Sequence, residues 1–319
     1  MTDVPLIPAV SEEVEILVAA LDSLIEGEAA AERLIAAGPQ VIPYLERFLL
    51  KGRPRTIARP RCRAVHALGE LGAWPVLVEY FRQYRRPDDA VVLFAEDAVR
   101  SIAAQELGRW KSAEVYEVLL KAARERATGG LVRALSEFQR AESIPVLFSM
   151  LDDDLCRNDA EKALRKMPDP ARAWAVLSLR GAAGPSTHLA SAVRRRSTTL
   201  QLLREFGVEL GEWPTLREFL DDRDADAVIA TAGIGFAIGP PSDHPAIVRA
   251  LFHISQHLNW AQEDEVIRLL DGHRDEACEH ARGLIEAADA KGQRPNWLVP
   301  RWRILRHLLG PETGAAAQR

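Results

Sequence analysis

The sequence of 319 residues contains few cysteines and no long apolar run. Its three cysteines, Cys62, Cys156 and Cys278, are far apart and form no C-x-x-C pair. This spacing argues against a disulfide framework or a zinc-thiolate site and favours a reducing, cytoplasmic compartment. No apolar run reaches about 18 residues, so we expect no membrane-spanning helix. Residues 1–5 lack the cationic region of a secretory signal, so none is expected either.

Aromatic residues and strand patterns are also scarce. Aromatic side chains make up 6% of the chain, whereas 47% of its residues are hydrophobic and 27% are charged. The apolar and charged fractions are those of ordinary folded proteins and exclude a largely disordered chain. No sustained alternation of apolar and polar residues predicts a strand. Apolar residues instead recur three and four positions apart, which predicts an all-α fold with essentially no β-sheet.

One tetrad, an apolar residue followed by proline, another apolar residue and leucine, returns along the chain. It begins at Ile42, Trp74 and Ile144, with weaker copies at Tyr116, Trp174, Trp213 and His244. The mean spacing of about 34 residues is the length of two helices and two turns. Proline suits the first turn of a helix, where its missing N–H would have no partner. Each tetrad therefore predicts the start of the second helix of a pair.

The preceding helices carry a second pattern, Ala-x-x-Ala-Leu, at residues 64–68 and 160–164. Small residues at this spacing let helices approach closely. A helix pair of this length cannot bury both of its apolar faces alone, whereas stacked pairs can. The repeats therefore predict one continuous α-solenoid.

With these motifs, the chain resembles HEAT-repeat proteins, especially the bacterial short-repeat type also seen in phycobilisome lyases. The resemblance implies a right-handed superhelix of helix pairs. It is good over residues 28–182 and poor over 186–309. We expect an N-terminal capping helix in residues 1–27 and regular repeats in 28–184. Irregular repeats with a C-terminal cap are expected in 185–309, and a disordered tail in 310–319.

The resemblance leaves the function open, because this superfamily includes scaffolds, chaperone-like lyases and a few enzymes. Deoxyhypusine hydroxylases hold iron with His-Glu dipeptides, and this sequence has none. HEAT-like alkylpurine DNA glycosylases carry Asn-Trp-Asp and a second Asp. Here Asn259, Trp260 and Asp264 match that motif, but Ala261 replaces its middle acid. We therefore expect no cofactor and no catalytic residue from either enzyme.

The net charge of −5 is unevenly distributed. Residues 1–50 carry −7, residues 51–86 carry +7 and residues 201–240 carry −5. In HEAT arrays the second helices line the concave face. A cationic ridge there is expected to attract another protein or an acidic peptide, and we assign to it Arg82, Arg86, Lys121, Arg124 and Arg180. Only one band is strongly basic, so a nucleic acid is the less favoured partner.

Two further groups are candidates for function. Trp297 and Trp302 lie among arginines near the C-terminus, a composition typical of interface hot spots but also of an amphipathic cap. His253 and His257 are one helical turn apart, a spacing that can chelate a metal ion. The alternative is that the two histidines lie on a polar helix face or cap a helix.

The sequence favours a non-catalytic cytoplasmic scaffold that binds another protein along its concave face, without contact with a membrane. Two alternatives stay open. One is a lyase-like chaperone or modifying enzyme that acts on a bound protein or peptide, with its site in residues 186–309. The other is a HEAT-like DNA-binding protein or glycosylase.

Overall fold

The computed structural model describes residues 8–180, 190–292 and 299–310. Across these ranges the chain forms eighteen α-helices joined by short turns and contains no strand, which confirms the predicted all-α fold. None of these helices combines the length and the hydropathy needed to cross a bilayer. The chain divides into two compact units, Met1–Lys166 and Met167–Arg319. The boundary predicted near residues 184–185 falls outside the described residues.

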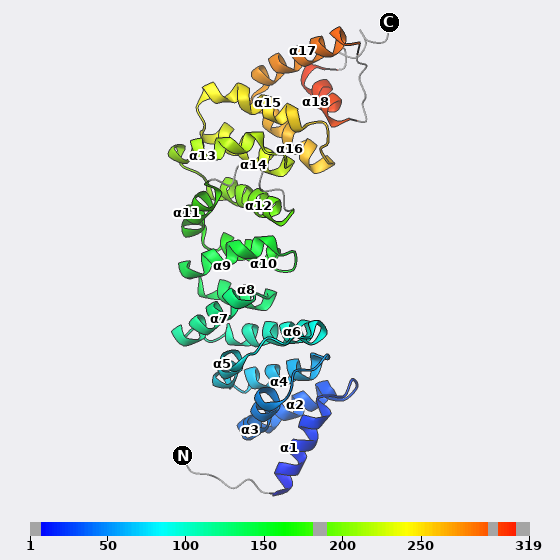
Figure 1. Cartoon of the computed structure of the whole chain (residues 1–319), viewed down its shortest axis with the longest axis vertical. Helices are drawn as coiled ribbons and strands as arrows, with labels where there is room; N and C mark the ends of the chain where they lie inside the picture. Colours follow the sequence, from blue (N-terminus) through cyan, green and yellow to red (C-terminus); the bar gives the residue numbers. More distant parts are fainter. Residues whose placement is uncertain (1–7, 181–189, 293–298, 311–319) are drawn as a thin grey trace. The chain divides into compact units, whose positions relative to one another are not determined.

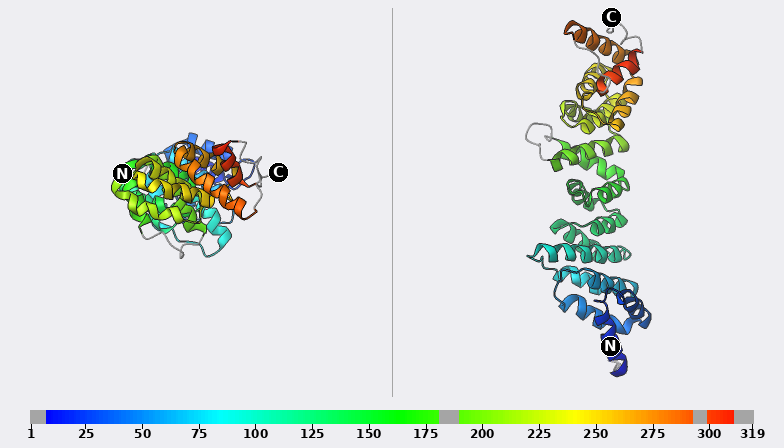
Figure 2. Two further views of the ribbon diagram at one scale, coloured as in Figure 1. Left: turned by 90° about the horizontal axis from the view of Figure 1, so that it is seen from above. Right: turned by 90° about the vertical axis from the view of Figure 1, so that its right-hand side faces the viewer.

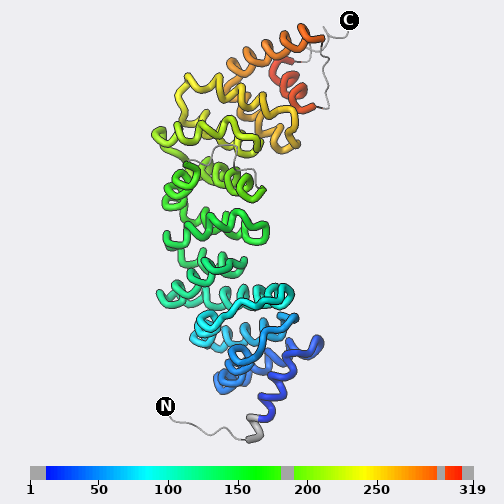
Figure 3. The backbone as a smooth tube through the Cα atoms, viewed as in Figure 1, coloured from blue at the N-terminus to red at the C-terminus, as the bar shows by residue number. Residues whose placement is uncertain are grey.

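Unit 1 (Met1–Lys166) is built from two rows of helices. In the first row α4 packs between α2 and α6, and α8 packs between α6 and α10. The second row lies beside it: α5 packs against α7 and against η2, a π-helix that continues α3. Figures 1 and 3 show the chain passing from one row to the other at each short turn. The helices are α1 (Pro8–Ala20), α2 (Gly27–Ala37), α3 (Ile42–Glu46), η2 (Arg47–Lys51), α4 (Arg59–Glu70), α5 (Trp74–Gln83), α6 (Ala90–Leu107), α7 (Ala113–Glu125), α8 (Gly129–Phe138), α9 (Ile144–Ser149) and α10 (Arg157–Arg165).

Unit 2 (Met167–Arg319) repeats this two-row arrangement. Its first row contains α12, α14, α16 and α18, each packed against the next. In the second row α11 contacts α13, and α15 contacts α17. The right-hand view of Figure 2 shows this succession from green to red. The helices are α11 (Pro168–Leu179), α12 (Ala190–Phe206), α13 (Trp213–Arg217), α14 (Ala225–Ile238), α15 (His244–Ile254), α16 (Trp260–Asp271), α17 (Arg274–Ala290) and α18 (Pro300–Leu309).

The proline tetrads mark helix starts where they contain proline. Helices α3, α5, α9, α13 and α15 each begin at the first residue of such a tetrad. The two copies without proline do not. Tyr116 lies inside α7, and Trp174 lies inside α11, which begins at Pro168. The last residue of that copy, Leu177, is 54% exposed, so its frame was wrong.

The small residues predicted to allow close stacking are buried. Ala64, Ala67, Ala160 and Ala163 are fully inaccessible. The closest approach is at Gly130 of α8, where an added Cβ atom would overlap the backbone of Ser101 in α6. A single hydrophobic cluster runs through unit 1 from residue 14 to residue 146, which shows that successive helix pairs share one core.

Candidate functional site

The cations predicted to form a ridge differ in their ion pairing and in whether they lie on a helix. Arg82 of α5 is neutralised by Glu114 of α7, with its Nη2 2.6 Å from Oε1. Arg86 was expected on the same helix face, but α5 ends at Gln83, so Arg86 is exposed in the following loop. Lys121 and Arg124 are both exposed on α7, and neither forms an ion pair within the described residues.

The remaining predicted partner-binding residues belong to unit 2. Arg180 is exposed directly after α11. Trp297 lies outside the described residues. Trp302, in α18, is half-buried.

The arginines beside Trp302 make contacts inside unit 2. Arg303 Nε donates to Glu263 Oε1 at 2.7 Å, and Arg301 Nη2 donates to the Phe252 carbonyl oxygen at 2.8 Å. These contacts fit the role of a cap that closes the helix array.

The two histidines predicted as metal ligands lie on either side of the end of a helix. Helix α15 ends at Ile254, so His253 is in its last turn and His257 follows the helix. Both are exposed. Among the described residues, the groups of three or more side chains close enough to share a metal ion include neither of them.

The glycosylase-like residues have local roles. Asn259 caps α16: its side chain accepts from the Gln262 backbone N–H, and the Gln262 side chain accepts from the Asn259 N–H. Trp260 is 77% exposed, and the Arg303 guanidinium lies 5.3 Å from its ring centroid.

The structure divides the basic band of residues 51–63 into buried and exposed arginines. Three arginines of this band, Arg59, Arg61 and Arg63, are in the first turns of α4, and Arg61 and Arg63 are buried. Arg63 Nη1 donates to the carbonyl oxygens of Leu21 and Ser23, both at 2.8 Å. Arg61 Nη1 donates to the Gly52 carbonyl oxygen at 3.3 Å. The two side chains thereby fix the α1–α2 turn and the end of η2 to α4.

Arg61 is also part of a buried polar cluster. Its Nε lies 2.8 Å from Glu96 Oε1, and both side chains are less than 10% exposed. Tyr80 donates its hydroxyl to Glu96 Oε2 at 3.0 Å. Burial and the adjacent Glu96 carboxylate raise the pKa of Tyr80 well above its usual range, which keeps the hydroxyl as a donor. Because every charge is paired, the cluster holds α4, α5 and α6 together without an isolated buried ion.

A pocket of about 690 Å³ lies between the elements that these arginines fix. Leu24 of the α1–α2 turn, Ile57 of the segment before α4 and Val92 of α6 give it apolar walls. Its volume is within the range of sites that bind small molecules or single peptide side chains. We call this feature the α4 pocket. Its other lining residues are Asp22, Pro54, Arg55, Thr56, Arg59, Pro60 and Arg63.

The rim of the α4 pocket exposes apolar and cationic side chains together. Leu24 is 74% exposed and Ile57 is 60% exposed. Ile25, next in sequence to Leu24, is 92% exposed. Large aliphatic side chains that gather at one place on a surface are typical of interaction sites.

The charges at the rim are partly unpaired. Arg55 pairs with Asp22 at 2.6 Å. Arg59, and the neighbouring Lys51 and Arg53, are exposed, and no carboxylate of the described residues lies within ion-pair distance of them. Among the charged lining residues, three arginines therefore outnumber the single acid, Asp22, beside the apolar side chains.

The concentration of positive charge between residues 51 and 63 was visible in the sequence, but which of its arginines are buried was not. Charge alone does not distinguish the buried Arg61 and Arg63 from the exposed Arg59. The phase of α4 does not distinguish them either, because Arg59 and Arg63 are four positions apart and lie on the same side of the helix. Arg63 differs in that it contacts the α1–α2 turn, which is distant in sequence. The apolar walls come from segments far apart in the sequence, so no motif could indicate them.

Searches against protein-family models and curated proteins find no match for this chain.

Proposed function

We propose that each unit is a HEAT-like α-solenoid and that the chain is a non-catalytic scaffold of the cytoplasm. The serial packing of helix pairs within each unit supports the solenoid. The prolines at the starts of five second helices support the HEAT-like assignment. The three unpaired cysteines suit a reducing compartment.

We further propose that unit 1 binds an acidic, partly apolar segment of another protein at the α4 pocket. The observation that carries this proposal is the juxtaposition of Leu24 and Ile57, both largely exposed, with the unpaired Arg59. Aliphatic side chains of a partner would fill the pocket, and its carboxylates would meet the cations at the rim. The location differs from the concave face inferred from the resemblance, because the pocket lies at the N-terminal ends of α4 and α6.

Two electrostatic effects favour a negatively charged ligand there. Lys51, Arg53 and Arg59 attract carboxylates and speed their encounter with the surface. The N-terminal end of a helix also carries a partial positive charge, and α4 begins at Arg59 itself. Arg82 attracts a negatively charged ligand less strongly, because Glu114 already neutralises it.

The test is fluorescence anisotropy with labelled peptides and the full chain. The probe is a short amphipathic peptide of Leu and Glu, compared with one in which Lys replaces Glu and one in which Ser replaces Leu. Only the Leu–Glu peptide is expected to bind well, because the pocket needs both apolar and acidic groups. Its affinity should fall as salt rises, since the rim charges are exposed and screened.

Variants localise the binding. The double variant Ile57→Ser/Arg59→Glu is expected to weaken binding by about tenfold or more, equivalent to about 1.4 kcal/mol. The matched control, Lys121→Glu/Arg124→Glu, changes two exposed cations of the same unit and should leave binding unchanged. Loss of binding in the control with retention in the pocket variant would overturn the location in favour of the predicted ridge. Equal binding of the Ser–Glu peptide would reduce the effect to non-specific charge attraction and overturn the proposed pocket.

A further inference from the structure

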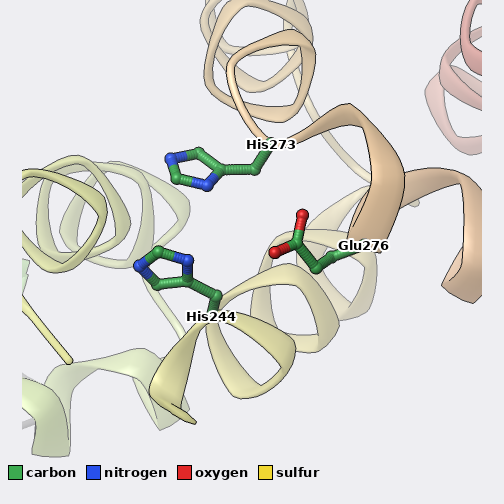
Figure 4. A group of neighbouring side chains, drawn as sticks. All are labelled: His244, His273 and Glu276. Atoms are coloured by element: carbon green, nitrogen blue, oxygen red, sulfur yellow. The ribbon is translucent and has the colours of Figure 1, made fainter. Parts of the chain in front are cut away.

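Unit 2 contains a cluster of three potential metal ligands that the sequence patterns did not indicate. His244 is the first residue of α15, His273 directly precedes α17, and Glu276 lies in the first turn of α17. One nitrogen of each imidazole and one carboxylate oxygen of Glu276 lie within 4.8 Å of one another, and all three residues are half-buried. Figure 4 shows the two imidazoles and the carboxylate facing a common space.

Aromatic packing restrains the two imidazole rings. Phe236 of α14 stacks on His273, with 3.8 Å between ring centroids and an interplanar angle of 12°. The ring of His244 lies edge-on to both, with centroids 4.6 Å from His273 and 5.4 Å from Phe236. Because three helices contribute to this packing, the imidazoles are held close together before any ligand arrives. Such preorganisation is what a binding site requires of its donors.

The electrostatics of the cluster favour a cation despite its position. Helix N-termini disfavour positive charge, and both α15 and α17 begin here. The first turn of α17 offsets this with two carboxylates, Asp275 and Glu276.

We propose that His244, His273 and Glu276 bind a divalent first-row transition-metal ion, for which Zn²⁺ is the probe. Two imidazoles and one carboxylate form a known three-ligand set for such ions and leave a fourth position for water. Ligand bonds of about 2.0–2.1 Å in tetrahedral geometry require donor atoms about 3.3 Å apart. The proposal requires donors that now lie within 4.8 Å of one another to close to about this spacing when the ion binds.

A second cluster in unit 1 shows why donor proximity alone is insufficient. His66, Glu70 and Glu106 are as close together as the three residues of unit 2. However, Arg109 Nη1 lies 2.6 Å from Glu70 Oε1 and 2.9 Å from Glu106 Oε2. The guanidinium already satisfies these carboxylates and repels a metal ion. No such cation pairs with Glu276 within the described residues. We therefore expect the cluster of unit 2 to bind a metal ion and the cluster of unit 1 not to bind one.

The test is calorimetric titration of the full, metal-stripped chain with Zn²⁺, together with Co²⁺ absorption spectra. We expect one ion per chain and a Co²⁺ spectrum of low coordination number. His273→Phe keeps the ring that stacks on Phe236 but removes its donor nitrogens, and Glu276→Gln keeps the size but removes the charge. Each should weaken Zn²⁺ binding at least about tenfold. Circular dichroism of both variants checks that they remain folded.

The matched control is His253→Ala/His257→Ala, which removes two exposed histidines from the same unit. A second control, His66→Gln, tests the cluster of unit 1. Both controls should bind one Zn²⁺ as the unaltered chain does. Absence of Zn²⁺ binding by the unaltered chain would overturn the proposal. So would full binding by folded His273→Phe and Glu276→Gln, or its loss in either control.

Discussion

The guanidinium of Arg63 occupies the space beside Gly27 where any other residue would carry a Cβ atom. A Cβ atom on Gly27 would overlap Nη1 and Cζ of Arg63 and lie 2.9 Å from the Leu21 carbonyl oxygen. From this position Nη1 donates to the carbonyl oxygens of Leu21 and Ser23. The missing side chain therefore allows a buried arginine to close the α1–α2 turn, which forms one wall of the α4 pocket.

Gly27→Ala should destabilise unit 1, although alanine is the better helix former. In an open helical position this change stabilises a protein by about 1 kcal/mol. Here the new methyl group displaces Arg63 from two carbonyl oxygens, and we expect a net loss of about 1–3 kcal/mol. Urea unfolding followed by circular dichroism measures it.

Gly283→Ala provides the contrast. Gly283 lies in α17, and no atom of the residues that the structure describes lies within 4 Å of its added Cβ outside its own helix turn. This variant should gain stability, by up to about 1 kcal/mol. Because the residues belong to different units, each change is read from the transition of its own unit. An equal gain in stability from Gly27→Ala would show that the contacts of Arg63 do not require a glycine at position 27.

The helical class was predictable because it is a local property. The three- and four-residue spacing of apolar side chains and the prolines at Pro43, Pro75 and Pro145 act within single helices. The register of a repeat without proline was not predictable in this way. Trp174 to Leu177 imitates the tetrad, but α11 starts earlier because Pro168 supplies an earlier first turn.

The surroundings of the candidate sites were less predictable, because they depend on contacts between segments far apart in the chain. His253 and His257 have chelating spacing, but the helix ends between them. His244 and His273 are 29 positions apart in sequence and become neighbours only through the packing of α15 on α17. Arg82 has the phase of an exposed cation, yet the acid that neutralises it comes from α7.

Removing one partner of the Arg61–Glu96 pair should cost more than removing both. Glu96→Leu leaves the Arg61 charge buried and removes the acceptor of Tyr80, so we expect a loss of about 3–5 kcal/mol. In Arg61→Met/Glu96→Leu both charges are gone, and the loss should be smaller than for Glu96→Leu alone. A double-mutant cycle by urea unfolding compares them. Additive losses in the double variant would contradict the paired arrangement.

The stability of unit 1 should fall as the pH rises from 9 to 11. Burial raises the pKa of the Cys62 thiol and of the Cys156 thiol from 9.0 to about 11. The unfolded chain therefore loses these protons first, and the stability present below pH 9 is lost as the pH approaches 11.

Cys62→Ala/Cys156→Ala isolates this effect in unfolding experiments across that range. The titration of Tyr80 is unchanged in the variant, so it cancels in the comparison. The difference in unfolding free energy between the unaltered chain and the variant should shrink as the pH rises. A constant difference from pH 9 to pH 11 would mean that the thiols titrate alike in both states.

Two leucines at the same tetrad position provide a direct measure of which copies of the repeat are real. Leu147 ends the tetrad that opens α9 and is fully buried, whereas Leu177 ends the misaligned copy and is 54% exposed. Leu147→Ala should cost about 2–5 kcal/mol, because it opens a cavity in a packed core. Leu177→Ala should change stability by no more than about 0.5 kcal/mol. Similar losses, measured from the unfolding transition of each unit, would mean that Leu177 is buried and that the tetrad at Trp174 is a true repeat after all.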